Sequence, residues 1–399
     1  MRRYPALLAI SLLLSMTAAS AAMADSFLGD GVVASEVSPT QDALYATAVG
    51  SDGIYLAGMD GSPGAGQWRL EKRSLEDGEL VAKFGRSGVV TIDPSPGWDR
   101  ITALVLDGRQ LFLVGESDTT LRIEKRSASR GRLRKSFGVG GVLQFPRETV
   151  VWNSSNAATV LRKHLYVPTG SGRILRIRTD TGETIASVRP AAAPGAPELV
   201  TALAGDGPAI FVAAGTAYGF RFEKRGIHQG RLLWRVDEPF TLVGCGPEAP
   251  QALVATRDSL LVGGMREGLW HLERRRKRDG ALLWSVDDAG NGNCDIVYDL
   301  VIAGTSLFAV GVHNSRRRIE KRRLDDGSLV AEFGNGGVID SPRRVLEAFS
   351  AVDACGDLVA SGVATNGGTN EEWYSTRIDP ITGAPVTVRR PACAGRAPR

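Results

Sequence analysis

The chain has 399 residues, of which 43% are apolar and 23% are charged, and it contains 48 glycines. This composition indicates a folded globular protein with many turns. The formal charge of +4 falls to +2 without the two arginines at positions 2 and 3, so the overall charge argues against a nucleic-acid partner.

Residues 1–24 are typical of a secretory signal peptide. The two arginines precede an apolar run over residues 6–16, and small residues lead to Ala22, Met23 and Ala24. The run is too short to cross a bilayer, and no later stretch approaches the roughly 20 continuous apolar residues of a membrane helix. We therefore predict cleavage after Ala24 and an exported protein without a membrane span, located in the periplasm, at the cell surface or outside the cell.

A short apolar strand that ends in glycine recurs along the rest of the chain. Its seven copies are 54–58, 111–115, 165–170, 210–215, 260–264, 307–311 and 358–362. Each copy is followed by a strand that mixes apolar and charged residues. This second strand reads LEKR at 70–73, IEKR at 123–126, FEKR at 222–225, LERR at 272–275 and IEKR at 319–322, with degenerate copies near Ile174 and Tyr374.

One turn glycine lies seven residues beyond the Glu position of each charged strand. These glycines are Gly78, Gly131, Gly182, Gly230, Gly280, Gly327 and Gly383, at spacings of 53, 51, 48, 50, 47 and 56 residues. Such a period, with one glycine-marked hairpin per unit, predicts four-stranded blades. We therefore expect an all-β fold: a single seven-bladed β-propeller of four-stranded antiparallel blades, formed by residues 25–388.

The second unit illustrates the expected blade. Its predicted strands are 101–106, 111–114, 121–125 and 132–137. The first two strands are more apolar than the third, as expected if they lie nearest the packed centre.

The two termini offer a way to close the ring. The segment FLGDGVV at 27–33 is similar to FGRSGVV at 84–90, FGVGGVL at 137–143 and FGNGGVI at 333–339, whereas the seventh unit lacks such an ending. A propeller must cover its last edge, because an open edge leaves backbone groups unpaired. We predict that the mature N-terminal segment completes the seventh blade, and that residues 389–399 form a basic C-terminal tail.

The chain has four cysteines, Cys245, Cys294, Cys355 and Cys393. An even number in an exported protein predicts disulfide bonds, and four cysteines allow three pairings. We favour Cys245 with Cys294 and Cys355 with Cys393, because the first two precede consecutive repeats at similar places. Buried free thiols remain the alternative.

The FG-x-x-GV segments resemble delta-60 repeats, and the segments GRLLW at 230–234, GALLW at 280–284 and DTGE at 180–183 resemble the repeats of quinoprotein-like propellers. The resemblance covers nearly all of the mature chain and implies the propeller fold. It is less specific for function, since such propellers include enzymes, assembly factors and surface proteins. A quinoprotein dehydrogenase would use pyrroloquinoline quinone (PQQ) with calcium, usually on eight blades and often beside adjacent cysteines; this chain has seven repeats and no adjacent cysteines.

Other chemical motifs are weak. The segment DDAGNGNCD at 287–295 resembles a calcium loop, but Ala289 stands at a ligand position and Tyr298 at that of the bidentate Glu, so we favour a polar loop between blades. The histidines, His164, His228, His271 and His313, lie in different units and form no close-spaced metal-ligand pair. We therefore nominate no catalytic residue and no metal ligand, and leave cofactor-binding residues unknown.

The repeated charged strands and aromatic residues have structural interpretations. We expect the Glu-Lys-Arg strands, and the RRRKR cluster at 274–278, to form a solvated and partly paired surface. Trp68, Trp270, Trp373 and Phe220 share one register, which predicts packing between blades.

The most consistent functional hypothesis is an exported, non-catalytic propeller without a cofactor, acting as a monomeric binding or scaffold protein whose loops contact a protein or a glycan. The alternative is a quinoprotein-type periplasmic oxidoreductase with PQQ and calcium.

Overall fold

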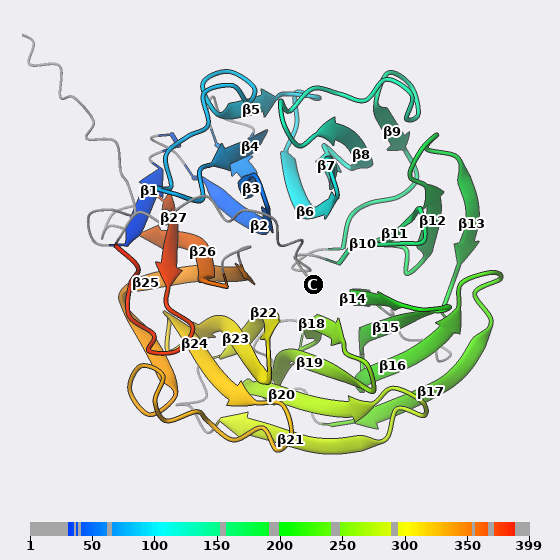
Figure 1. The fold of residues 1–399 in the computed structure, drawn as a ribbon. Helices are drawn as coiled ribbons and strands as arrows, with labels where there is room; N and C mark the ends of the chain where they lie inside the picture. Colours follow the sequence, from blue (N-terminus) through cyan, green and yellow to red (C-terminus); the bar gives the residue numbers. More distant parts are fainter. Residues whose placement is uncertain are drawn as a thin grey trace, which may run out of the picture.

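A computed structural model describes residues 31–35, 37–38, 41–61, 66–151, 157–190, 199–240, 248–288, 294–352, 356–365 and 371–387; for 342–352, 364–365 and 371 only the backbone is described. The predicted signal peptide 1–24 and tail 389–399 lie outside these residues. The strands form a ring of seven blades around a central axis (Figure 1), which confirms the predicted fold class. No helix in the described part of the chain is long and apolar enough to cross a membrane.

Each blade is a four-stranded antiparallel sheet. The strands follow chain order from the axis to the rim, except that the outer strand of the seventh blade comes from the N-terminal part of the chain. Blade 1 contains β2 (Ala43–Gly50), β3 (Gly53–Asp60), β4 (Gln67–Arg73) and β5 (Val89–Ile92). Blade 2 contains β6 (Asp99–Asp107), β7 (Gln110–Ser117), β8 (Thr120–Ser127) and β9 (Val142–Phe145). Blade 3 contains β10 (Thr159–Leu161), β11 (His164–Pro168), β12 (Ile174–Arg178) and β13 (Thr184–Val188).

Blade 4 contains β14 (Leu199–Asp206), β15 (Ala209–Thr216), β16 (Gly219–Gly226) and β17 (Leu232–Pro239). Blade 5 contains β18 (Pro250–Ala255), β19 (Ser259–Arg266), β20 (Leu269–Arg276) and β21 (Leu282–Asp288). Blade 6 contains β22 (Ile296–Ala303), β23 (Ser306–His313), β24 (Arg316–Arg323) and the first part of β25 (Val338–Val352). Blade 7 contains the second part of β25, β26 (Leu358–Thr365), β27 (Glu371–Ile378) and β1 (Val32–Ser35).

The ring closes through the N-terminal strand, as predicted. Strand β1 pairs antiparallel with β27, in a register that sets Val32 opposite Thr376 and Ser35 opposite Trp373. The side chain of Val33 is 1% exposed in the core shared by blades 7 and 1. The first four residues of the FLGDGVV segment, 27–30, lie outside the described residues.

The predicted fourth strand of the second unit was wrong. Residues 132–137 form no strand apart from an isolated bridge between Leu133 and Arg126, and the rim strand is β9. The reason is the glycine-rich turn before β9: Gly138, Gly140 and Gly141 all have positive φ, which reverses the chain after Phe137. The FG-x-x-G segment is therefore the turn that leads into the rim strand, and Phe137 is fully buried beneath it.

The prediction of a solvated Glu-Lys-Arg surface was also wrong. The five glutamates of the motif, Glu71, Glu124, Glu223, Glu273 and Glu320, are at most 1% exposed. Each pairs with the arginine two residues later, on the same side of the strand, and that arginine also donates to the carbonyl of its turn glycine. Side chains alternate between the two faces of a strand, but both faces of a blade are covered by neighbouring blades. The charged side chains are therefore buried whichever face they lie on.

The cation that follows the glutamate links each blade to the next. In all seven blades a Lys or Arg at this position donates to a backbone carbonyl in the 3–4 turn of the following blade. The pairs are Lys72 to Ala128, Lys125 to Thr179, Arg176 to His228, Lys224 to Lys277, Arg274 to Leu324, Lys321 to Pro380 and Arg377 to Leu75. The last pair joins blade 7 to blade 1, so the chain of links is circular.

The aromatic register is confirmed as packing between blades. Trp68, Trp270, Trp373 and Phe220 are at most 1% exposed. The guanidinium of Arg69 lies 5.9 Å from the Trp373 ring, and that of Arg122 lies 5.9 Å from the Trp68 ring, each across a blade interface. Burial of both aromatic and charged groups in the same interface sets the rotation of one blade against the next.

Candidate binding groove between the third and fourth blades

A groove opens between β12 and β13 of blade 3 and the turn that joins the third and fourth strands of blade 4. The volume that the centres of water molecules can occupy in it is about 30 Å³, which is room for about two waters, so the groove is small. Its apolar walls come from Ile174, Val188, Ile210 and Ile227, while Tyr166, Arg176, Arg225 and His228 contribute polar groups. Such a site suits a mainly apolar group that carries one or two polar atoms.

The groove exists because blade 3 lacks an aromatic side chain that other blades have. Trp234 in blade 4 and Trp284 in blade 5 each lie four residues after their turn glycine, and both donate an indole N–H to the next blade. Ala186 occupies the same place in blade 3 and lines the groove. In blades 1, 2 and 6, a phenylalanine from the FG turn packs against the aromatic residue of the second strand instead.

Tyr166 shows the consequence for hydrogen bonding. The equivalent residue in blade 1, Tyr55, donates its hydroxyl 2.8 Å to Asp52 and lies 2.9 Å from the carbonyl of Ala128 in the next blade. Tyr166 is 5% exposed, yet its hydroxyl has no hydrogen-bond partner among the residues that the structure describes. Burial raises the pKa of Tyr166, so the group is a neutral hydroxyl available as a donor.

Arg176 supplies positive charge at the groove. One guanidinium nitrogen lies 3.2 Å from the carbonyl of His228, and another lies 3.3 Å from Nε2 of His164. Burial and the neighbouring Arg176 lower the pKa of His164. An unpartnered buried hydroxyl beside a guanidinium favours a ligand atom that accepts hydrogen bonds, such as a carbonyl or carboxylate oxygen.

The histidines lie in strands and turns, as expected. The sequence did not indicate that two of them contact the same arginine. His164 and His228, from different blades, both contact Arg176 at the groove. His271 is fully buried in the interface between blades 4 and 5, with Nδ1 2.5 Å from Asp287 and its ring centroid 5.7 Å from that of Phe220.

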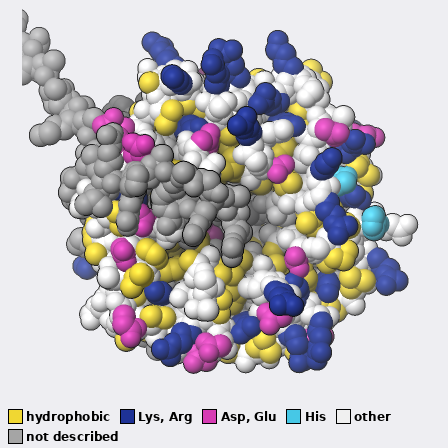
Figure 2. Space-filling view, viewed as in Figure 1, with side chains coloured by type: hydrophobic (Ala, Val, Ile, Leu, Met, Phe, Trp, Pro, Cys, Tyr) yellow, Lys and Arg dark blue, Asp and Glu magenta, His cyan; other side chains and the backbone are white. Residues whose placement is uncertain are grey.

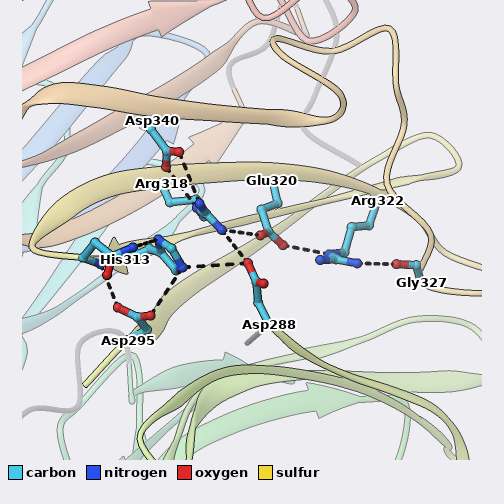
Figure 3. Close-up of polar contacts among 9 residues, drawn as sticks. Asp288, Asp295, His313, Arg318, Glu320, Arg322, Gly327 and Asp340 are labelled. Carbon is cyan, nitrogen blue, oxygen red and sulfur yellow. Dashed lines mark hydrogen bonds and ion pairs between the residues drawn. The ribbon is translucent and has the colours of Figure 1, made fainter. Parts of the chain in front are cut away.

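A charged network spans blades 5 and 6 (Figure 3). Arg318 contacts Asp288 at the end of β21, Glu320 beside it in β24, and Asp340 in β25, at 2.5, 3.6 and 2.9 Å. Asp295 is fully buried and accepts the backbone N–H of Asn314 at 2.7 Å. Asp288 and Asp340 hold Arg318 in place, and Asp295 holds the turn at Asn314. Because Asp288 belongs to blade 5 and Arg318 to blade 6, the network links the two blades.

The network also accounts for part of the calcium-loop segment. Asp287, Asp288 and Asp295 have the structural partners just described, while residues 289–293 lie outside the described residues. Among the cysteines only Cys294 is described, and Cys245, Cys355 and Cys393 are not, so both disulfide pairings stay predictions.

Within the described ranges, no three or more His, Cys, Asp or Glu side chains gather in a way that could hold a metal ion. The quinoprotein alternative, with PQQ and calcium, stays a prediction.

Sequence reasoning missed the groove, although the signal was present. Residues 182–186 read GETIA where blades 4 and 5 read GRLLW and GALLW, so the absent tryptophan is visible in the repeat alignment. The degenerate charged strand of blade 3 carries Leu175 and Ile177 in place of the buried Glu and Arg. Both departures fall in blade 3: Ala186 lines the groove, whereas Leu175 and Ile177 pack on the opposite side of the blade, against blade 2.

No protein-family model matches the chain, and no curated protein sequence matches it either. Solved structures match its fold. BamB from Moraxella catarrhalis is 13% identical, with a TM-score of 0.51 over 84% of this chain and 85% of that one. The WD40 repeats of RRP9 are 12% identical, with a TM-score of 0.56 over 88% and 98% of the two chains. The WD40 propeller domain of Doa1 is 11% identical, with a TM-score of 0.52 over 85% and 94%. These similarities show that the chain has the β-propeller fold.

Proposed function

We propose that this chain is an exported, non-catalytic β-propeller that binds a protein partner through an aromatic side chain seated in the groove between blades 3 and 4. The single observation that carries the proposal is the contrast between Tyr55 and Tyr166: the same buried hydroxyl has two partners in blade 1 and, within the described part of the chain, none in blade 3. The delta-60 and quinoprotein-like repeat pattern supports a place among extracytoplasmic propellers, and the signal-like residues 1–24 support export.

A protein partner fits the groove better than a glycan does. The walls are mainly aliphatic, and the missing group in the blade pattern is an indole. Sugars need several polar side chains to satisfy their hydroxyls, whereas an aromatic side chain needs apolar walls and few polar atoms. The Tyr166 hydroxyl and the Arg176 guanidinium would bind a backbone carbonyl or carboxylate next to the aromatic residue of the partner.

The test compares two variants of adjacent residues in β13. Ala186→Trp fills the groove from within, whereas Ser187→Trp adds the same side chain at an exposed position of the same strand. N-acetyl-tryptophanamide is titrated into each protein by calorimetry. We expect saturable binding at about millimolar Kd in the original protein and in Ser187→Trp, and none in Ala186→Trp.

A photo-reactive benzoylphenylalanine at position 228, an exposed position that lines the groove, then tests for the protein partner in the exporting cell. One discrete cross-linked protein is expected, and it should disappear when Ala186→Trp is added. Unchanged cross-linking in the filled variant, or equal binding of the probe to both tryptophan variants, would contradict the proposal. Native mass spectrometry with PQQ and calcium tests the oxidoreductase alternative, for which a bound quinone would be decisive.

A further inference from the structure

The 1–2 and 3–4 turns of blades 2 and 3 form one continuous surface. The N–H of Ala128 donates to the carbonyl of Arg109 at 3.0 Å, which holds the two turns of blade 2 side by side. The N–H of Thr179 makes the same contact with Lys163 in blade 3, at 3.0 Å. The N–H of Gly138 donates to Thr181 at 2.8 Å and joins the two blades.

This surface is strongly basic. The basic surface is defined by six exposed side chains: Arg109, Arg130, Arg132, Arg134, Arg162 and Lys163. Figure 2 shows Lys and Arg side chains along the upper and right-hand edges of the view, where blades 1 to 3 lie in Figure 1, as well as along the lower edge. None of the six has an ion-pair partner among the residues that the structure describes, whereas the exposed cations Arg276 and Arg278 of blade 5 both pair with Asp279. The same turns also carry the acids Asp107, Asp180 and Glu183, of which Asp180 pairs with Arg178, so the six cations outnumber the acids and the surface is net positive.

Two features of the basic surface oppose local stability. In blades 5 and 6, Asp279 and Asp326 precede the turn glycine and accept a backbone N–H at 3.2 and 2.9 Å. Blade 2 has Arg130 at that position and so loses this cap. Arg162 and Lys163 have φ of 49° and 61°, in the left-handed region that favours glycine and asparagine. At these positions an acidic residue or a glycine would make the turns more stable than the cations do. We infer that the positive charge itself has a function.

The arrangement favours an extended anionic polymer over a compact ligand. The cations come from four turns in two successive blades, so a chain with repeated negative charges can contact several of them at once, and guanidinium groups bind carboxylates in a bidentate manner. The exposed large hydrophobic residues of the described chain include Val139 near this surface, but none of its aromatic members, Trp98 and Tyr218, lies in these turns. The surface therefore lacks the stacking platforms of single-stranded nucleic-acid sites and the broad apolar face of membrane-surface helices.

We propose that the basic surface binds an acidic polysaccharide, at a site separate from the groove. The probe is polygalacturonate, measured by calorimetry at 50 and 200 mM salt against neutral dextran of similar length. We expect binding to polygalacturonate alone, weakened at least tenfold at the higher salt.

The first variant, Arg130→Asp with Arg132→Ser, installs the Asp-Gly-Ser turn that blade 6 already has at 326–328. We expect at least tenfold weaker binding and a melting temperature equal to or above that of the original protein, because Asp restores the missing turn cap. Its control, Arg278→Asp with Arg257→Ser, makes the same charge change on exposed turns of blade 5 and should weaken binding less than threefold. The second variant, Arg162→Asn with Lys163→Gly, should melt at a higher temperature and bind more weakly, a combination that general damage to the fold cannot produce.

Equal binding of dextran, or equal losses in the blade 2 and blade 5 variants, would overturn the proposal. Tighter binding of a single-stranded oligonucleotide or of phosphatidylglycerol vesicles than of polygalacturonate would overturn it too. Ala186→Trp should bind polygalacturonate normally, which separates this site from the groove.

Discussion

Replacing Glu124 with glutamine should destabilise the propeller by about 3 to 5 kcal/mol, because it breaks a buried ion pair from one side. Glu124 is fully buried and faces two arginines of its own strand. Its carboxylate oxygens lie 2.6 Å from Nη2 of Arg122 and 2.6 Å from Nη2 of Arg126. Glutamine keeps the shape but removes the charge, so two guanidinium groups at the blade interface would share one neutral acceptor.

Blade 3 provides the matched control. The double substitution Glu124→Leu with Arg126→Ile copies Leu175 and Ile177, which occupy the same two positions and are 4% and 0% exposed. This change removes the buried carboxylate together with Arg126, the more buried of its two partners. It leaves the partly exposed Arg122 without Glu124, and the carbonyl of Gly131 without the Arg126 donor. We expect a loss of about 1 to 2 kcal/mol, less than half that of Glu124→Gln.

Equilibrium urea unfolding measures both losses, with tryptophan fluorescence as the probe. Trp68 is a local reporter, since it is buried in the same interface under Arg122. A loss below about 1 kcal/mol for Glu124→Gln would refute the reasoning, as would an equal loss for the two variants, because the cost would then not arise from an uncompensated buried charge.

Three further predictions concern closure, the groove and pH. Deleting residues 25–36 removes β1 and the buried Val33, so the free energy of unfolding should fall by about 2 kcal/mol or more in urea titrations; an unchanged transition would contradict closure through β1. Ala186→Trp should raise that free energy by about 0.5 to 2 kcal/mol, as cavity filling does, and a loss would show that the groove does not fit an indole. Burial lowers the pKa of His271, but its hydrogen bond to Asp287 and the nearby carboxylate of Glu273 outweigh this and leave the pKa raised above its usual value. The contribution of His271 to stability should therefore be fully present below about pH 6.5 and decline as pH rises through the raised pKa; His271→Gln should remove this dependence in unfolding curves from pH 6 to 9, and an unchanged pH profile would exclude the pair as its source.

The sequence by itself determined the repeat and the closure of the ring. Strand and turn signals are local: an apolar strand ending in glycine and a turn glycine at a fixed distance specify one hairpin wherever they recur. Seven copies therefore predicted seven blades, and the similarity of 27–33 to the segments before the rim strands predicted the closing strand. The error at 132–137 was of the same local kind, since the apolar residues of the FG turn were taken for a strand.

Only the tertiary structure decided which charges are buried and which are exposed. Glu71 and Lys72 point to opposite sides of one strand, and both are buried because another blade covers each side. Conversely, Arg109 and Arg162 lie 53 residues apart in the chain but on one surface, because consecutive blades place equivalent turns side by side. The groove has the same origin. The repeats show Ala186 in place of a tryptophan, but only the packing of blade 3 against blade 4 turns the absent indole into a space beside the Tyr166 hydroxyl.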